Sequence, residues 1–174
     1  MSDTTAFRDA SEPRLVTVCG LPGVGKSTVT KELAARLDAA SVRTDGVRRD
    51  VLDERTYADA EAWLVYGAAL ERARARLADG HTVVLDGTFK TAAHRSRAAD
   101  LGAAHATADA LVWVTCDEAV ARTRIDERRD DPSEADIEVY DILREEFEPP
   151  EDADLVVDNS DSLASTEKQL AAWL

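Results

Sequence analysis

Cysteine and long apolar runs are scarce in this sequence, and both shortages limit what the protein can be. Its 174 residues include only two cysteines, Cys19 and Cys116, and neither has another cysteine or a histidine at the spacing of a metal site. A metal centre built on cysteine is therefore excluded, and both cysteines are expected to be buried, reduced thiols. No run of about 18 apolar residues occurs, so the sequence predicts no membrane span.

Positive charge is also in short supply. The 21 lysines and arginines face 35 aspartates and glutamates, which gives a formal net charge of −14. This acidic composition resembles that of proteins from salt-loving organisms, and a GC-rich mesophile is the alternative source. Such charge disfavours nonspecific nucleic-acid binding in dilute buffer, but molar salt screens charges within about 3 Å. A nucleic-acid substrate is therefore disfavoured and not excluded.

The first 13 residues are polar and contain no apolar segment of the kind that a secretory signal needs. We expect residues 1–13 to form a flexible N-terminal tail and residues 14–174 to fold as a single domain. These features together predict a cytoplasmic protein.

The stretch from Leu15 to Thr28, LVTVCGLPGVGKST, combines a strand, a loop and a helix in a fixed order. Its apolar start predicts a buried strand over 15–19. The pattern G-x-x-x-x-G-K-[ST] then begins at Gly20, and a helical pattern follows from Ser27. This order predicts a phosphate-binding loop, in which glycines let backbone N–H groups point at phosphate oxygens and the helix N-terminus adds its positive dipole end.

Each residue of this loop has an expected role in binding ATP and Mg²⁺. Lys26 is expected to reach the β- and γ-phosphates, the Ser27 hydroxyl to bind Mg²⁺, and Thr28 to approach the α-phosphate. The residues expected to bind the nucleotide are Gly20, Leu21, Pro22, Gly23, Val24, Gly25, Lys26, Ser27 and Thr28.

Strand and helix patterns alternate along the rest of the chain. We expect strands over 40–44, 81–85, 111–115 and 155–157, and helices over 27–37, 57–79, 92–101, 118–129, 133–147 and 162–174. In the long helix over 57–79, Trp63 and Leu64 are expected to face the core. Gly102 is expected to end the next helix, over 92–101. Alternating strands and helices predict an α/β fold whose parallel sheet is covered on both faces.

Two aspartates follow predicted strands, where ligands bind in such sheets. Asp45 lies outside the phosphate loop and could accept the proton of an attacking hydroxyl. Arg48, three residues further on, falls on the same side of a helical turn and could bind an anionic acceptor. Asp86 ends an apolar strand and could reach Mg²⁺ or orient Arg48, and the sequence leaves both roles open.

Arginines are concentrated in one predicted helix of this acidic chain. Arg122, Arg124, Arg128 and Arg129 lie within eight positions. Cations on a mobile lid can neutralise the charge of a phosphoryl group during transfer, so we expect a lid over approximately 118–147. The alternative is a solvated helix whose arginines pair with acidic residues one turn away.

Four segments resemble one family. They are GLPGVGKST at 20–28, RTDGVR at 43–48, VVLDGTF at 83–89 and RRDDPSEAD at 128–136. The chain resembles the P-loop proteins of the predicted-kinase group, often described as AAA-type ATP-binding proteins, which includes the kinase domain of polynucleotide kinase. The resemblance implies a P-loop NTPase fold, a three-layer α/β/α arrangement with five parallel strands in the order 2-3-1-4-5 and an arginine-rich helical lid. It also implies that Asp45 is the general base, that Arg48 lies on the substrate side, and that Arg128 or Arg129 acts from the lid.

The expected activity is transfer of the γ-phosphate of ATP, with Mg²⁺, to a hydroxyl acceptor. The acceptor could be a 5′-hydroxyl of nucleic acid or a small anionic metabolite. The alternative is a small-molecule kinase of the same fold that acts on a nucleoside, a sugar or an antibiotic. The catalytic candidates are Lys26, Asp45, Arg48, Arg128 and Arg129, with Arg122 on the nucleotide and Ser27 and Asp86 on the metal. A regulatory ATPase without an acceptor is the rival, and it would need no base at Asp45.

Overall fold

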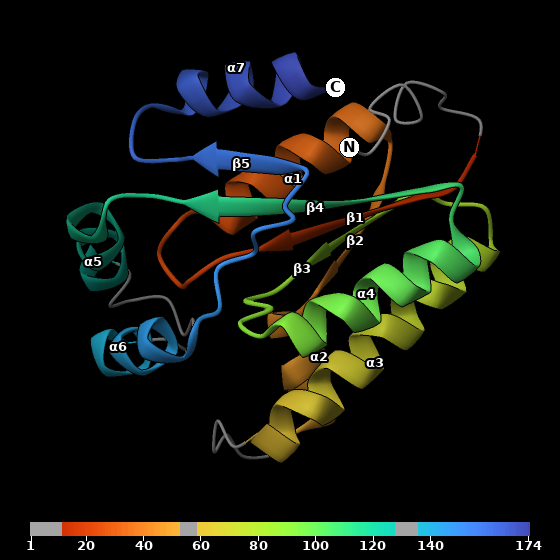
Figure 1. The fold of residues 1–174 in the computed structure, drawn as a ribbon, viewed down its shortest axis with the longest axis horizontal. Helices are drawn as coiled ribbons and strands as arrows, with labels where there is room; N and C mark the ends of the chain where they lie inside the picture. The colour runs from red at the N-terminus through yellow and green to blue at the C-terminus, as the bar shows by residue number, and fades with distance from the viewer. Residues whose placement is uncertain (1–11, 53–58, 128–135) are drawn as a thin grey trace.

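Five strands form one parallel sheet in the computed structural model, which describes residues 12–52, 59–127 and 136–174. The strand order is β2-β3-β1-β4-β5, and this confirms the predicted order (Figure 1). The strands of the described chain are β1 (Arg14–Cys19), β2 (Ala40–Arg43), β3 (Val83–Asp86), β4 (Ala108–Thr115) and β5 (Leu155–Asp158).

Helices cover both faces of the sheet, which confirms the three-layer arrangement. Helices α1 and α7 lie on one face, and α3 and α4 lie on the other (Figure 1). Helices α5 and α6 lie beyond the carboxyl end of β4. The helices of the described residues are α1 (Lys26–Leu37), α2 (Thr44–Val51), α3 (Asp59–Ala78), α4 (Ala92–His105), α5 (Glu118–Glu127), α6 (Ile137–Glu146) and α7 (Leu163–Trp173).

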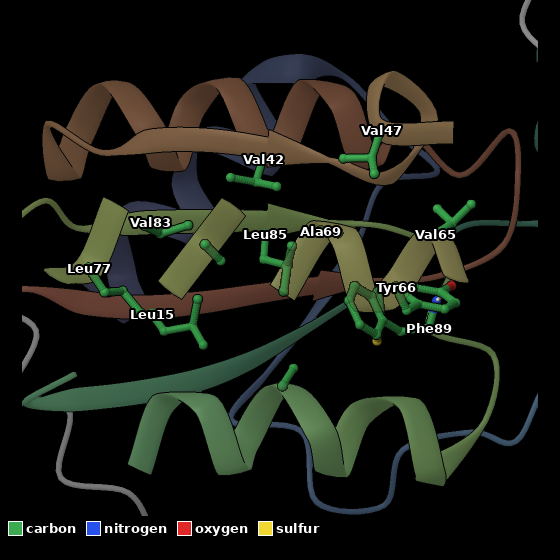
Figure 2. Packing of buried hydrophobic residues seen from close by; sticks show 13 residues of the cluster. Leu15, Val42, Val47, Val65, Tyr66, Ala69, Leu77, Val83, Leu85 and Phe89 are labelled. Carbon is green, nitrogen blue, oxygen red and sulfur yellow. Dashed lines mark hydrogen bonds between the residues drawn. The ribbon is translucent and has the colours of Figure 1, made fainter. Parts of the chain in front are cut away.

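Strand β1 contributes to two apolar cores, because successive side chains of a central parallel strand point to opposite, covered faces. Val16 and Val18 join the core beneath α1 and α7, whereas Leu15 and Cys19 join the core beneath α3 and α4. Figure 2 shows this second core, in which the Tyr66 ring of α3 lies beside that of Phe89, 4.7 Å away, in the segment after β3. The two cores fix β1 and β3, and therefore the loops that leave their carboxyl ends.

The buried face of α3 differs from the predicted one. Trp63 is 50% exposed and Leu64 is 54% exposed, so the expectation that they face the core is wrong. The helix instead buries Val65, Ala69 and Ala73 against the sheet. Small alanine side chains let the helix lie close to the strands, and this rotates the larger Trp63 and Leu64 towards solvent.

Helix α4 continues past Gly102, where the sequence predicted its end. It runs to His105 because the glycine serves close packing rather than termination. A Cβ at Gly102 would lie 2.5 Å from the Cβ of Asp109 in β4, a distance that real side chains do not reach. Several strand boundaries also shift. In particular, β4 begins at Ala108, and β2 ends at Arg43, which places Asp45 in the first turn of α2.

The expected tail over 1–13 falls mostly outside the described residues, as does the middle of the expected lid. Asp136 caps α6 by accepting a hydrogen bond from the backbone N–H of Val139 at 2.9 Å. Within the residues that the structure describes, no helix combines the length and apolar character needed to cross a bilayer.

Candidate functional site

The predicted phosphate-binding loop connects the end of β1 to the start of α1. Its backbone takes conformations that side chains rarely allow, with φ of 78° at Gly23 and 90° at Gly25. A Cβ at Gly25 would lie 2.0 Å from Nδ2 of Asn159, and one at Gly23 would lie 2.6 Å from the carbonyl oxygen of Ala121. The loop is therefore packed against two other segments, and glycine is required at both positions.

The start of α1 is suited to an anion. The first turn of the helix contains no acidic residue. Gly25 occupies the N-cap position, and no side chain accepts a capping hydrogen bond there. The backbone N–H groups and the positive end of the helix dipole therefore face the loop without a competing carboxylate. Lys26 lies at the same place and donates a hydrogen bond from Nζ to the carbonyl oxygen of Leu21 at 2.8 Å.

Arg43, at the end of β2, connects the phosphate-binding loop to two carboxylates. Its Nε donates to Oδ2 of Asp86 at 3.1 Å, and its Nη2 donates to Oγ of Ser27 at 2.6 Å. The same Nη2 lies 3.9 Å from Oδ2 of Asp45. The sheet explains this meeting, because Arg43 and Asp86 are direct partners in the register of β2 with β3.

Asp86 and Asp45 occupy different environments. Asp86 is only 4% exposed, and this burial raises the pKa of its carboxyl above the usual value, while the positive charges of Lys26 and Arg43 act in the opposite direction. The side chain of Asp45 is 63% exposed. A buried carboxylate between two cations is suited to binding, whereas an accessible one can exchange a proton with a substrate.

Ser27 and Asp86 have the chemistry of a magnesium site. Both place an oxygen against one cation, the Arg43 guanidinium, and hydroxyl and carboxylate oxygens are ligands that Mg²⁺ prefers. No group of three or more potential metal-binding His, Cys, Asp or Glu residues occurs in the described part of the chain. A site with few protein ligands fits Mg²⁺, which keeps several waters and is completed by substrate phosphates.

Arg48 lies beside α3, where it forms an ion pair with Glu61. The side chain of Arg48 is 16% exposed and that of Glu61 is 6% exposed, so both are largely withdrawn from water. Next to them, Tyr66 accepts a hydrogen bond from the backbone N–H of Phe89 at 2.8 Å. Burial raises the pKa of Tyr66, so this hydroxyl stays protonated.

The arginines of α5 fall into two groups. Arg122 pairs with Glu118 at 2.9 Å and with Asp141 of α6, and its guanidinium lies 5.3 Å from the Tyr140 ring centroid. Arg124 instead contacts the phosphate-binding loop, with Nη1 3.5 Å from the carbonyl oxygen of Val24. The role of Arg122 in nucleotide binding stays a prediction, and Arg128 and Arg129 lie outside the described residues.

Asn159 follows β5 and fixes the loop from the other side. Its Nδ2 donates to the carbonyl oxygen of Val24 at 2.8 Å, and its Oδ1 accepts from the Thr166 hydroxyl at 2.6 Å. Its own carbonyl oxygen accepts from Nη2 of Arg124 at 2.9 Å. The loop is thus held between β5 and α5 by polar contacts as well as by packing.

Sequence reasoning missed three residues of this site: Arg43, Glu61 and Asn159. Arg43 stands two positions before Asp45 in the segment RTDGVR, and its position at a strand end was the available signal. Asn159 also follows a strand end directly. Glu61 gave no signal, because an acidic residue near the start of a long helix is expected to face water.

The family comparison supports the description of the fold. A family model described as AAA domain matches residues 15–150. An uncharacterized protein from Mycobacterium tuberculosis strain H37Rv is 38% identical over 115 residues, which are 59% of this chain and 23% of that protein. The chain therefore spans less than a quarter of the length of the curated relatives that it matches.

Solved structures of kinases share the architecture. A gluconokinase from Sinorhizobium meliloti 1021 has a TM-score of 0.72 at 21% identity, covering 92% of this chain and 91% of its own. The Mycobacterium tuberculosis APS kinase CysC, solved with AMPPNP and APS, has a TM-score of 0.71 at 18% identity, covering 93% and 97%. At such identities the likeness shows the fold, which is that of a P-loop kinase. Together with the family model, which covers most of the chain, it shows that this protein belongs to the AAA domain family and has a P-loop kinase-like domain.

Proposed function

We propose that this protein is an ATP-dependent kinase that transfers the γ-phosphate of ATP to a hydroxyl group. One observation carries the proposal. A single nitrogen, Nη2 of Arg43, lies 2.6 Å from Oγ of Ser27 and 3.9 Å from Oδ2 of Asp45. The Ser27 hydroxyl of the phosphate-binding loop and the accessible Asp45 carboxylate therefore lie close to the same guanidinium nitrogen. Phosphoryl transfer needs such proximity, because the loop binds the phosphoryl donor and the base must reach the acceptor hydroxyl.

Each of these residues has a role in the proposed transfer. The loop N–H groups and Lys26 bind the phosphates, and Ser27 and Asp86 hold Mg²⁺, which neutralises phosphate charge when it is bound. The acceptor oxygen attacks the γ-phosphorus, its proton passes to the carboxylate of Asp45, and the bond to the β,γ-bridging oxygen breaks to release ADP. Arg128 or Arg129 neutralises the transferring group from the lid, and Arg122 and Arg124 act on the nucleotide side.

The acceptor that we favour carries a nucleobase, with a polynucleotide 5′-hydroxyl as the first candidate. The supporting observation is Trp63, which is half exposed, lies 4.9 Å from the His94 ring, and has the Arg97 guanidinium 4.6 Å from its centroid. An exposed tryptophan beside an arginine is a surface on which a base can stack. His94 in turn packs at 4.3 Å on Tyr66, the buried residue next to the Arg48–Glu61 pair.

A small anionic metabolite is the alternative acceptor. The gluconokinase and the APS kinase of the same fold act on such molecules, as their names state. Three cations near the proposed acceptor side already have protein partners, however: Arg48 pairs with Glu61, Lys90 with Glu146, and Arg95 donates to the carbonyl oxygen of Phe89. An acceptor recognised through its negative charge would have to displace these contacts, whereas a base that stacks on Trp63 would not.

An acceptor panel tests the proposal. The wild-type protein and Lys26→Ala are incubated with γ-labelled ATP and Mg²⁺, separately with a 5′-hydroxyl oligonucleotide, a nucleoside and a sugar acid, in low and in molar KCl. Label on an acceptor with the wild type alone supports a kinase and names its acceptor class. Release of labelled phosphate with every acceptor unlabelled would instead support a regulatory ATPase.

The proposed stacking surface has its own control. Trp63→Ala should raise the KM for a base-bearing acceptor several-fold and leave the KM for ATP unchanged, since one base–aromatic stack contributes about 1–3 kcal/mol. Leu64→Ala, an equally exposed neighbour on α3, should change neither value.

A further inference from the structure

The Arg43 guanidinium occupies the place between the two groups proposed to bind Mg²⁺. It donates one hydrogen bond to Oγ of Ser27 at 2.6 Å and another to Oδ2 of Asp86 at 3.1 Å. The side chain is 44% exposed, so it can leave this place without opening the core. No part of the predicted mechanism assigns a role to this residue.

We propose that Arg43 is a positioning residue that competes with Mg²⁺ for Ser27 and Asp86, and so sets how strongly ATP binding depends on the metal. This inference rests on the proposed function, in which those two residues hold the ion. A Mg²⁺ ion binds oxygen at about 2.0–2.1 Å and demands near-octahedral geometry. A guanidinium that donates to the same two oxygens places a second positive charge against that position, so the two cations exclude each other.

The fold returns Arg43 to this place whenever the metal is absent. Arg43 and Asp86 are paired residues of adjacent strands, and the backbone register keeps their side chains side by side on one face. Asp86 is 4% exposed, so a cation at this point compensates a carboxylate that water reaches poorly. The structure therefore contains an internal cation that partly replaces the metal.

A second acceptor for the guanidinium lies close by. Oδ2 of Asp45 is 3.9 Å from Nη2, and the Asp45 side chain is exposed. When Mg²⁺ takes Ser27 and Asp86, Arg43 keeps an acidic partner by turning to Asp45. Displacement then exchanges one charge pair for another, and its cost is small enough for the ion to overcome.

The test measures the coupling between metal and nucleotide. The dissociation constant of an imido analogue of ATP is determined by calorimetry in EDTA and in saturating Mg²⁺. The value in EDTA divided by the value in Mg²⁺ gives the coupling. Taking a ratio cancels any contribution that the arginine charge makes equally to nucleotide binding in both conditions. Arg43→Gln is the test variant, and Arg43→Met is the second variant should the first fold poorly.

Arg74→Gln is the matched control, because Arg74 is 47% exposed, pairs with Glu71 one turn away, and lies on the solvent side of α3. We expect the ratio to rise about fivefold in Arg43→Gln, which corresponds to the loss of one partly exposed charge pair, and to stay unchanged in Arg74→Gln. An unchanged or lower ratio in both Arg43 variants would overturn the inference. A wild-type protein that binds no nucleotide in either condition would overturn the proposed function itself.

Discussion

Asn159 connects the phosphate-binding loop to α7, and its replacement by alanine should weaken both the fold and the site. The side chain makes two hydrogen bonds, to Val24 at 2.8 Å and with Thr166 at 2.6 Å. All three residues are buried, with Asn159 6% exposed, Val24 4% and Thr166 1%, so water cannot replace the lost partners.

The expected loss follows from these contacts. A buried hydrogen bond contributes about 0.5–1.5 kcal/mol net, and an unsatisfied buried group costs about 1–3 kcal/mol. Val24 retains a weak contact with Arg124 at 3.5 Å, which reduces the loss on that side. We therefore expect Asn159→Ala to lower the free energy of unfolding by about 2–3 kcal/mol and the Tm by roughly 4–12 °C.

Urea unfolding, followed by tryptophan fluorescence, measures the stability, and calorimetry measures the affinity for the ATP analogue. Affinity should fall several-fold in Asn159→Ala because the carbonyl of Val24, within the loop, loses its anchor. Thr166→Val is the matched control: it removes only the hydrogen bond to Oδ1 of Asn159, keeps the one from Asn159 to Val24, and should cost about 1–1.5 kcal/mol without changing nucleotide affinity. A loss below about 0.5 kcal/mol in Asn159→Ala, with unchanged affinity, would refute this reasoning.

Three further predictions concern single positions. Gly25→Ala should abolish nucleotide binding in a calorimetric titration, because its Cβ would lie 2.0 Å from a side-chain amide at a φ of 90°. Glu61→Gln should lower the free energy of unfolding by about 2 kcal/mol in urea, because Arg48 keeps its charge but loses a charged partner. Burial raises the pKa of Cys19 from 9.0 to about 12, so its thiol should stay unalkylated in the native protein while half-buried Cys116 reacts, as mass spectrometry can show. By linkage, the neutral Cys19 thiol favours the fold below about pH 9, and this stability is lost as pH rises towards 12, which urea unfolding at several pH values would measure.

The sequence was sufficient to predict the fold, because three signals agreed. The apolar runs located every strand of the sheet, the glycine pattern located the loop at Gly20–Gly25, and helical periods filled the intervals between strands. The strand order, which the family resemblance implied, was also correct. Local pattern and global topology are consistent in this chain, and such consistency allows a fold to be predicted from the sequence.

The errors arose where packing against another element decided the outcome. Gly102 has the residue type of a helix end, but the nearby Asp109 side chain makes it a packing position. Trp63 looked like a core residue because it is large and apolar, whereas the alanines of α3 determine which face approaches the sheet. Periodicity alone gives no information on how closely two elements approach.

The site was predicted in part for a similar reason. Motif residues such as Lys26 and Ser27 have fixed neighbours within one segment, and the structure places them at the start of α1. Arg43, Glu61 and Asn159 gain their positions from contacts with residues that are 13 to 135 positions away in the sequence. No local pattern encodes such contacts.

Transfer of the labelled γ-phosphate of ATP to a 5′-hydroxyl oligonucleotide, in Mg²⁺ and molar KCl, tests the central claim most directly when Asp45→Asn is measured beside the wild type. The account predicts that the asparagine variant binds the ATP analogue in EDTA as the wild type does, because the Asp45 side chain is exposed and lies 3.9 Å from its ion-pair partner. Its rate of transfer should fall by about 10²–10⁴-fold, the usual contribution of a general base. Transfer by Asp45→Asn at the wild-type rate would contradict the account.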